Sequence, residues 1–194
     1  MPKVGMEPIR KAALVKATIL EIGRAGSLDV TVSQIAKRAG MSTALAHHYF
    51  GSKEDMFLAA MRHVLSLYGA EVRGALHLAD TPEARLMAIL RASFSPANFR
   101  REVVGAWLNF WVLAQTAPQA QRLLTIYEHR LQSNLTHALR PLVGARAPRV
   151  AEAAAAMIDG VYLRQALTRA TPDARAAVDL IRGMLDAELK GSHP

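Results

Sequence analysis

The chain has 194 residues, of which 51% are hydrophobic and only 6% aromatic, and its formal net charge is +8 at pH 7. It contains no cysteine, which excludes a disulfide framework, a thiolate nucleophile and a cysteine-based metal site. No basic and apolar leader opens the chain and no run of about 18 apolar residues occurs, so we expect a cytoplasmic protein without a signal peptide or membrane span.

The basic excess is concentrated near the N-terminus. Residues 1–53 carry eight basic and three acidic side chains, a net charge of +5, whereas the other 141 residues carry 16 basic and 13 acidic ones. A basic patch suits contacts to phosphate groups, which supply salt-dependent affinity for nucleic acid whatever its sequence. Many basic proteins have no nucleic-acid partner, so this charge supports DNA binding only together with a motif.

The N-terminal elements begin with an expected flexible arm over residues 1–8 and a first helix over about 9–25, which Gly26 ends. Thr31 and Gln34 then have the spacing of a capping box, which predicts the start of a second helix. Gly40 can end that helix, because glycine readily takes a positive φ. Ser42 can cap a third helix.

Two short capped helices around a glycine-containing turn predict a helix-turn-helix, whose second helix fits the major groove of DNA. Thr43, Ala44 and His47 would face the bases, while His48, Tyr49 and Lys53 would position the phosphate backbone. The full set of predicted DNA contacts is Thr31, Ser42, Thr43, Ala44, His47, His48, Tyr49 and Lys53.

The residues from Thr31 to Lys53 read T-V-x-x-I-A-x-x-A-G-M-S-x-x-x-x-x-H-Y-F-x-S-K, which resembles the signature of the TetR family of bacterial repressors. The likeness covers about Gly26 to Leu58. The family usually has glycine where this chain has Ala44, and an aromatic residue where it has His47. Because both positions lie on the outward face of the predicted recognition helix, these departures concern base preference rather than the fold.

The rest of the chain also predicts helices, which makes an all-α fold of about nine helices in total. We expect a helix-turn-helix DNA-binding domain over residues 1–52 and a helical ligand-binding and dimerisation domain over 53–194. The expected helices of the second domain cover about 53–77, 82–94, 98–115, 118–139, 149–170 and 174–189, with a loop at Pro141–Pro148 and a frayed tail over Lys190–Pro194.

Alanines on one side of the last two long helices would let helices approach closely. They favour a four-helix bundle between two subunits, as the family resemblance also implies, and therefore a homodimer. These alanines are Ala153, Ala154, Ala156, Ala166, Ala176 and Ala177.

The densest aromatic stretch is Ala106–Trp111. Trp107 and Trp111 are four residues apart, so both rings lie on one helix face, bordered by Phe110. Tyr127 and Tyr162 on later helices could converge on the same space. Aromatic faces attract quaternary ammonium groups by about 0.5–2 kcal/mol per contact. The alternative is that the tryptophans only fill the core.

Asp159 interrupts an apolar run in the middle of a predicted helix. A carboxylate in apolar surroundings is costly unless it is paired. Its partner could be Arg164 or another arginine, a hydrogen bond at a subunit interface, or a cationic ligand. The predicted ligand-binding set is Trp107, Phe110, Trp111, Tyr127, Asp159 and Tyr162.

Within the TetR family, several stretches resemble the choline-responsive repressors of glycine betaine synthesis genes. That resemblance implies operator DNA and choline as partners. It also favours the interpretation of Trp107, Phe110 and Trp111 as an aromatic cage for a cation. The stretches are Met1–Met6, Ser42–Thr43, His48–Phe50, Ala106–Trp111, Arg130–Leu135 and Ile158–Arg164.

Other functions remain open from the sequence. The chain could be a TetR-type sensor of a hydrophobic drug-like or metabolic compound, a nonspecific nucleoid protein, or a helical enzyme or scaffold. No G-x-S-x-G elbow, phosphate-binding glycine loop or helical zinc pair of histidines occurs. We therefore expect no enzyme activity, no cofactor and no metal site.

Overall fold

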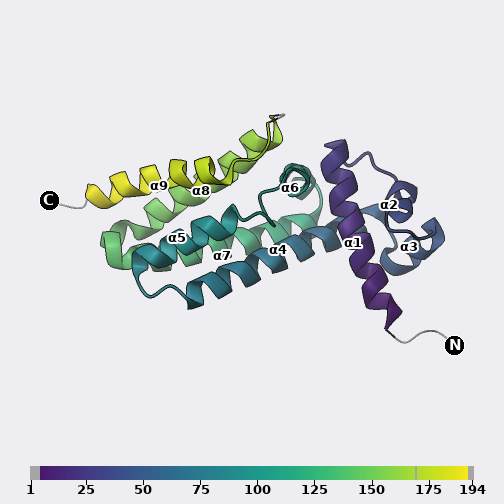
Figure 1. The fold of residues 1–194 in the computed structure, drawn as a ribbon, viewed down its shortest axis with the longest axis horizontal. Helices are drawn as coiled ribbons and strands as arrows, with labels where there is room; N and C mark the ends of the chain where they lie inside the picture. Colours follow the sequence, from purple (N-terminus) through teal and green to yellow (C-terminus); the bar gives the residue numbers. More distant parts are fainter. Residues whose placement is uncertain (1–4, 169, 192–194) are drawn as a thin grey trace.

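The computed structural model describes residues 5–168 and 170–191, and this part of the chain is all-helical, as predicted (Figure 1). No described helix has both the length and the apolar character needed to cross a membrane. The helices are α1 (Met6–Ala25), α2 (Val32–Arg38), α3 (Thr43–Phe50), α4 (Lys53–His77), α5 (Pro82–Ser93), α6 (Arg101–Ala114), α7 (Pro118–Val143), α8 (Ala147–Ala166) and α9 (Ala174–Lys190), with a 3₁₀ turn η1 (Gly144–Arg146) before α8.

The three N-terminal helices form a head at one end of the molecule, and α4 leads from it into a body made of α4–α9 (Figure 1). Helices α2 and α3 of the head begin at the predicted capping residues. Thr31 Oγ1 accepts from the Gln34 amide at 3.1 Å and Gln34 Oε1 accepts from the Thr31 amide at 2.6 Å. Ser42 Oγ accepts from the Leu45 amide at 3.2 Å. Gly40 has a φ of 69°, which lets the chain turn between α2 and α3.

The predicted N-terminal arm and C-terminal tail are each partly wrong and partly outside the described residues. The first helix begins at Met6, so the expected arm is wrong for residues 6–8, while residues 1–4 lie outside the described part. At the other end α9 continues through Lys190, and residues 192–194 of the expected tail also lie outside it. Asp173 caps α9, because its carboxylate accepts from the Ala176 amide at 2.9 Å.

The predicted loop at Pro141–Pro148 is wrong. Helix α7 runs through Pro141 to Val143, and after the three-residue turn α8 begins at once with Pro148 in its first turn. A proline is tolerated in the first turn of a helix, where its missing N–H has no partner to lose. The buried side chains of Leu139 and Val143 keep the last turn of α7 packed on the core despite Pro141.

The neighbouring boundaries also differ from prediction. Helix α8 ends at Ala166 rather than about residue 170, and α6 begins at Arg101 rather than about 98. Asn98 lies before α6 rather than in it. Its buried side-chain amide donates to Glu71 Oε2 at 2.6 Å and to the Ala92 carbonyl at 3.1 Å. Ser95 Oγ donates to the same carboxylate at 2.7 Å, so the α5–α6 connection is tied to α4.

The head contacts the body where α1 crosses α6. A Cβ atom added to Gly23 would lie 2.3 Å from the Glu102 carbonyl oxygen, and one added to Gly105 would lie 3.1 Å from the Gly23 carbonyl oxygen. Real Cβ atoms essentially never approach as closely as the contact at Gly23, and the contact at Gly105 is tighter than most, so the two glycines let the backbones of α1 and α6 meet here. The two helices are therefore in direct backbone contact.

Candidate functional site

The outer surface of α3 presents the residues that the sequence predicts to read DNA. Ala44, His47 and His48 are exposed and Thr43 is partly exposed, whereas Ala46 on the opposite side is fully buried in the core. The α2–turn–α3 unit therefore has the inward and outward faces that a helix-turn-helix requires.

Three of these side chains have additional contacts. His47 Nδ1 lies 2.7 Å from the Gly51 carbonyl oxygen, which holds the ring near the end of α3. The His48 ring lies against Tyr49, with centroids 5.5 Å apart. Lys53 Nζ donates to the Leu28 carbonyl at 2.6 Å, so this ammonium also fastens α4 to the segment before α2.

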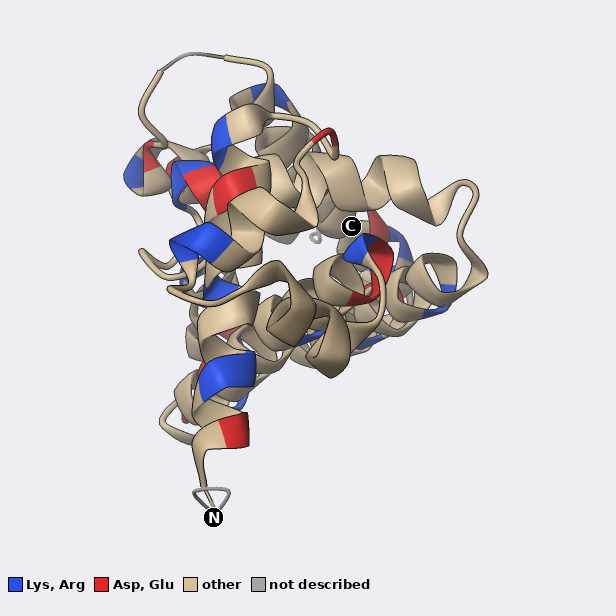
Figure 2. Ribbon diagram, turned by 90° about the vertical axis from the view of Figure 1, so that its right-hand side faces the viewer, with Lys and Arg blue, Asp and Glu red and all other residues tan. Residues whose placement is uncertain are grey.

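Figure 2 looks onto the head and shows basic positions spread along its helices among fewer acidic ones. Lys11 pairs with Glu7 at 2.7 Å, and Arg38 pairs with Glu21. Lys16, Lys37 and Arg24 form no ion pair with any described residue, which leaves a positive surface around the helix-turn-helix. Such a surface attracts the phosphate backbone.

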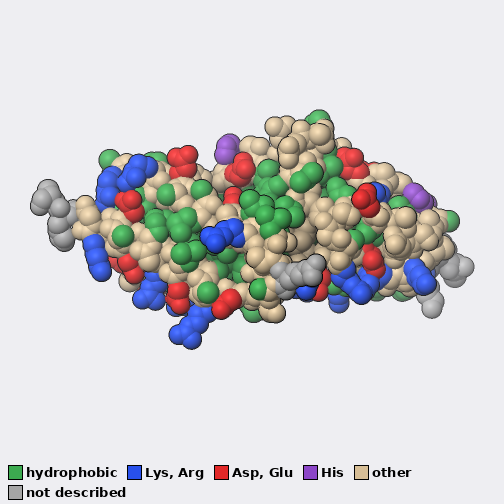
Figure 3. Space-filling view, turned by 90° about the horizontal axis from the view of Figure 1, so that it is seen from above, with side chains coloured by type: hydrophobic (Ala, Val, Ile, Leu, Met, Phe, Trp, Pro, Cys, Tyr) green, Lys and Arg blue, Asp and Glu red, His purple; other side chains and the backbone are tan. Residues whose placement is uncertain are grey.

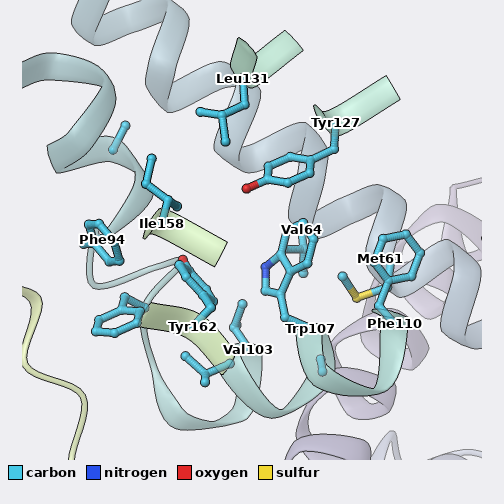
Figure 4. Close-up of a cluster of buried hydrophobic side chains, with 14 of the residues drawn as sticks. Met61, Val64, Phe94, Val103, Trp107, Phe110, Tyr127, Leu131, Ile158 and Tyr162 are labelled. Carbon is cyan, nitrogen blue, oxygen red and sulfur yellow. The ribbon is translucent and has the colours of Figure 1, made fainter. Parts of the chain in front are cut away.

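A small aromatic cavity lies in the body between α4, α6, α7 and α8. Its volume is about 10 Å³, room for about one water molecule. The rings of Trp107, Tyr127 and Tyr162 face one another around it (Figure 4), with centroids 4.7 Å apart for Trp107–Tyr127 and 6.1 Å for Trp107–Tyr162. The described lining consists of Val64, Tyr68, Ser93, Asn98, Trp107, Trp111, Tyr127, Ile158, Asp159 and Tyr162.

Five of the six residues predicted to bind a ligand line this cavity, and Phe110 does not. Phe110 is fully buried and packs edge-on against Phe57, with ring centroids 6.5 Å apart, on the side of Trp107 towards Met61 (Figure 4). It supports Trp107 from behind. Sequence reasoning missed Tyr68, although it is a hydroxyl-bearing residue in an apolar stripe one turn after Val64.

Asp159 is the one carboxylate in the described lining, and no arginine, lysine or histidine accompanies it there. Tyr127 donates a hydrogen bond to its Oδ1 at 3.1 Å. The possible ion pair with Arg164 is not formed, and Arg164 is exposed to solvent. Burial raises the pKa of the Asp159 carboxyl to about 6, although the Tyr127 hydroxyl opposes this rise. At pH 7.5 the cavity therefore holds a negative charge without a counter-ion in its lining.

The remaining hydroxyl groups of the cavity are held by Ser93. Tyr162 donates to the Ser93 carbonyl at 2.6 Å, and the Tyr68 hydroxyl lies 3.2 Å from Ser93 Oγ. Burial raises the pKa of Tyr68 to about 12 and that of Tyr162 further, so both phenols stay neutral. A carboxylate without a counter-ion, set among neutral aromatic rings, has the chemistry of a site for an organic cation.

The sequence matches known families over both parts of the chain. Residues 9–60 match the bacterial regulatory proteins of the tetR family, and residues 82–190 match the C-terminal domain of BetI-type transcriptional repressors. The HTH-type transcriptional regulator BetI of Brucella suis is 50% identical over 192 residues, 98% of this chain and 97% of the relative. The protein of the same name from Rhizobium meliloti is 48% identical over 99% of this chain and 95% of the relative.

Solved structures share the fold. A transcriptional regulator from Pseudomonas aeruginosa PAO1 is 27% identical and superposes with a TM-score of 0.80, covering 96% of this chain and 93% of that one. A regulator from Saccharomonospora viridis, crystallised in complex with choline, is 20% identical with a TM-score of 0.80 and covers 91% of this chain and 95% of that one. At that identity the second likeness concerns the fold alone.

Proposed function

We propose that this chain controls the genes for the enzymes that convert choline to glycine betaine, and that it responds to choline itself. The chain belongs to the TetR family of bacterial regulators and carries the BetI-type C-terminal domain. As a member of this family it is a DNA-binding transcriptional repressor and not an enzyme. The choline response rests above all on one observation: the Asp159 carboxylate lines the aromatic cavity, and its described lining holds no counter-ion.

Choline combines a trimethylammonium group with a hydroxyl. The rings of Trp107, Tyr127 and Tyr162 offer faces for the methyl-bearing cation, and Asp159 offers the opposite charge. Ser93 and the tyrosine hydroxyls offer partners for the alcohol. A purely hydrophobic ligand, the alternative left open by the sequence, would leave a buried carboxylate unpaired, which is costly.

The cavity is too small for choline as it stands, so binding must move its walls apart. One wall carries Tyr68 on α4, which begins at Lys53 directly after the head, and another carries Trp107 on α6, which meets α1 at the glycine crossing. We propose that choline favours an expanded body whose head no longer fits the operator. A ligand shifts an equilibrium only through its different affinity for the two states.

The DNA contacts and the dimer are parts of the same proposal, as is the division into domains 1–52 and 53–194. Leu163 of α8, Leu167 directly after α8 and Leu180 of α9 are 43%, 71% and 53% exposed. Hydrophobic side chains also gather on the side of the molecule that α8 and α9 cover (Figure 3). A partner pairing along this face would cover them and form the predicted four-helix bundle. The proposed DNA contacts are Thr31, Ser42, Thr43, Ala44, His47, His48, Tyr49 and Lys53.

Footprinting on the neighbouring intergenic DNA tests both halves of the proposal. We expect protection of two symmetry-related half-sites about 34–36 Å apart, as a dimer requires, and loss of protection when choline is added. Ala44→Glu should abolish protection, because it places a negative charge against the groove on an exposed position of α3. Ala70→Glu, equally exposed on α4 away from the head, should protect normally. Protection by Ala44→Glu as strong as by the wild type would refute the head assignment.

The affinity for choline should fall with acid. With a pKa of about 6 in the free protein, the Asp159 carboxyl is ionised at pH 8 and about nine-tenths protonated at pH 5, so binding should weaken about tenfold between these values. Bound choline stabilises the ionised carboxylate and so lowers the pKa of Asp159. Binding is therefore tighter at high pH, where the carboxyl is already ionised, and weaker at low pH. Calorimetric titrations of choline across pH 5–8 measure this. A flat profile would show that an ionised carboxylate takes no part in binding.

A further inference from the structure

A second and larger cavity lies outside the choline site, as a groove between α4 and α7. Its volume of about 510 Å³ is within the range of sites for small molecules. Tyr68 and Tyr127 form the wall that it shares with the aromatic cavity. Its apolar lining consists of Leu65, Val72 and Leu76 from α4 and Leu123, Ile126 and Leu131 from α7.

The charges of the groove have one sign. Arg62, Arg73 and Arg130 line it, and no acidic side chain occurs in its described lining. Glu71, the acid of α4 closest to Arg73 in sequence, is engaged elsewhere by Ser95 and Asn98. An organic cation such as choline is therefore disfavoured here, and an anion is favoured.

Two of the arginines lie level with each other on opposite walls. The hydrogen bond from Arg62 to Gln119 and the ring contact of Tyr68 with Tyr127 set the register of α4 and α7, which run in the same direction. By that register Arg73 of α4 faces the turn of α7 that holds Arg130. Arg73 also folds back over Gly69, where a Cβ would lie 3.3 Å from its Nη1 atom, so the missing side chain leaves room for the guanidinium.

We propose that this groove binds an aliphatic carboxylate, such as a medium-chain fatty acid, as a second effector site. The carboxylate lies between Arg73 and Arg130, and the hydrocarbon chain covers the leucine-lined floor towards Arg62. Guanidinium groups suit a carboxylate because their planar N–H groups match its two oxygens. The apolar floor excludes small inorganic anions as the preferred ligand, since these would leave it uncovered.

Calorimetric titration of the full-length protein with dodecanoate, below its micelle concentration and without choline or DNA, tests this site independently of the choline proposal. Arg73→Gln and Arg130→Gln should each weaken binding about tenfold, because each removes a charged hydrogen-bonding partner. Arg122→Gln removes the same charge from an exposed position of α7 outside the groove and should leave binding unchanged.

Ligand series supply the second readout. Affinity should rise by up to about fourfold per methylene from octanoate to dodecanoate, the equivalent of about 0.8 kcal/mol, and dodecanol should bind at least tenfold more weakly than dodecanoate. Dodecanol binding as tightly as dodecanoate would overturn the proposal, as would equal losses in all three arginine variants. So would dodecanoate that changes only the sedimentation of the protein, because the groove would then be an interface between copies.

Discussion

Asp159→Asn should weaken choline binding by about 100-fold or more while leaving operator binding intact. The substitution keeps the size of the side chain and an oxygen that can accept from Tyr127, so it removes little besides the negative charge. Loss of one partner of a buried charge pair costs about 3–5 kcal/mol, which is the origin of the expected factor. Calorimetry with choline and retardation of operator DNA measure the two properties on the same preparation.

The free variant supplies an internal check on this result. It should unfold at a temperature at least as high as the wild type at pH 8, because a buried charge without a counter-ion has been removed. Glu83→Gln is the matched control: this exposed carboxylate in the first turn of α5 does not line the cavity and does not contribute to the raised pKa of Asp159. Choline binding by Asp159→Asn within threefold of the wild type would remove the carboxylate from the proposed site.

Gly23→Ala should destabilise the whole protein through a single added methyl group. That methyl would lie 2.3 Å from the Glu102 carbonyl oxygen, on rigid helix backbone that cannot rotate away. Overpacking of this kind costs about 2–3 kcal/mol, so we expect the thermal midpoint to fall by roughly 5–10 °C at about 2–4 °C per kcal/mol. Circular dichroism during heating measures the change.

The control for this prediction is another helical glycine. A Cβ at Gly74 of α4 would meet nothing within 4 Å, so Gly74→Ala should stabilise the protein by up to about 1 kcal/mol through helix propensity alone. The opposite signs expected for the same chemical change isolate the effect of the α1–α6 contact. A Gly23→Ala variant as stable as Gly74→Ala would show that the two helices can separate freely at this point.

The head and most helix starts were predictable because their signals are local. Thr31, Ser42 and Ser52 each cap a helix within three residues of their own position, and Gly40 turns the chain where it stands. The failure at Pro141–Pro148 has the opposite cause. Two prolines indicate a break, but buried contacts of Val143 with the rest of the body carry α7 past the first of them. Packing overrides a local signal there.

The cavity was predictable only in part, since it depends on which helices meet. The spacing of Trp107 and Trp111 placed both rings on one face, and the interrupted apolar run singled out Asp159. Nothing local distinguishes Phe110, which points to the core, from its neighbours. The pairing of Gly23 with Gly105 joins residues 82 positions apart in the chain, and a sequence without structure does not connect them.

The closed state of the aromatic cavity also affects the choline concentration at which the proposed sensor responds. If only a small fraction of molecules is open at any moment, the apparent dissociation constant exceeds the intrinsic one by the inverse of that fraction. The concentration at which transcription switches then depends on how tightly Trp107 and its neighbouring rings close the cavity, as well as on their attraction for the cation. Substitutions that loosen this packing would lower the threshold without altering which metabolite is recognised, so the two properties can diverge independently among related regulators.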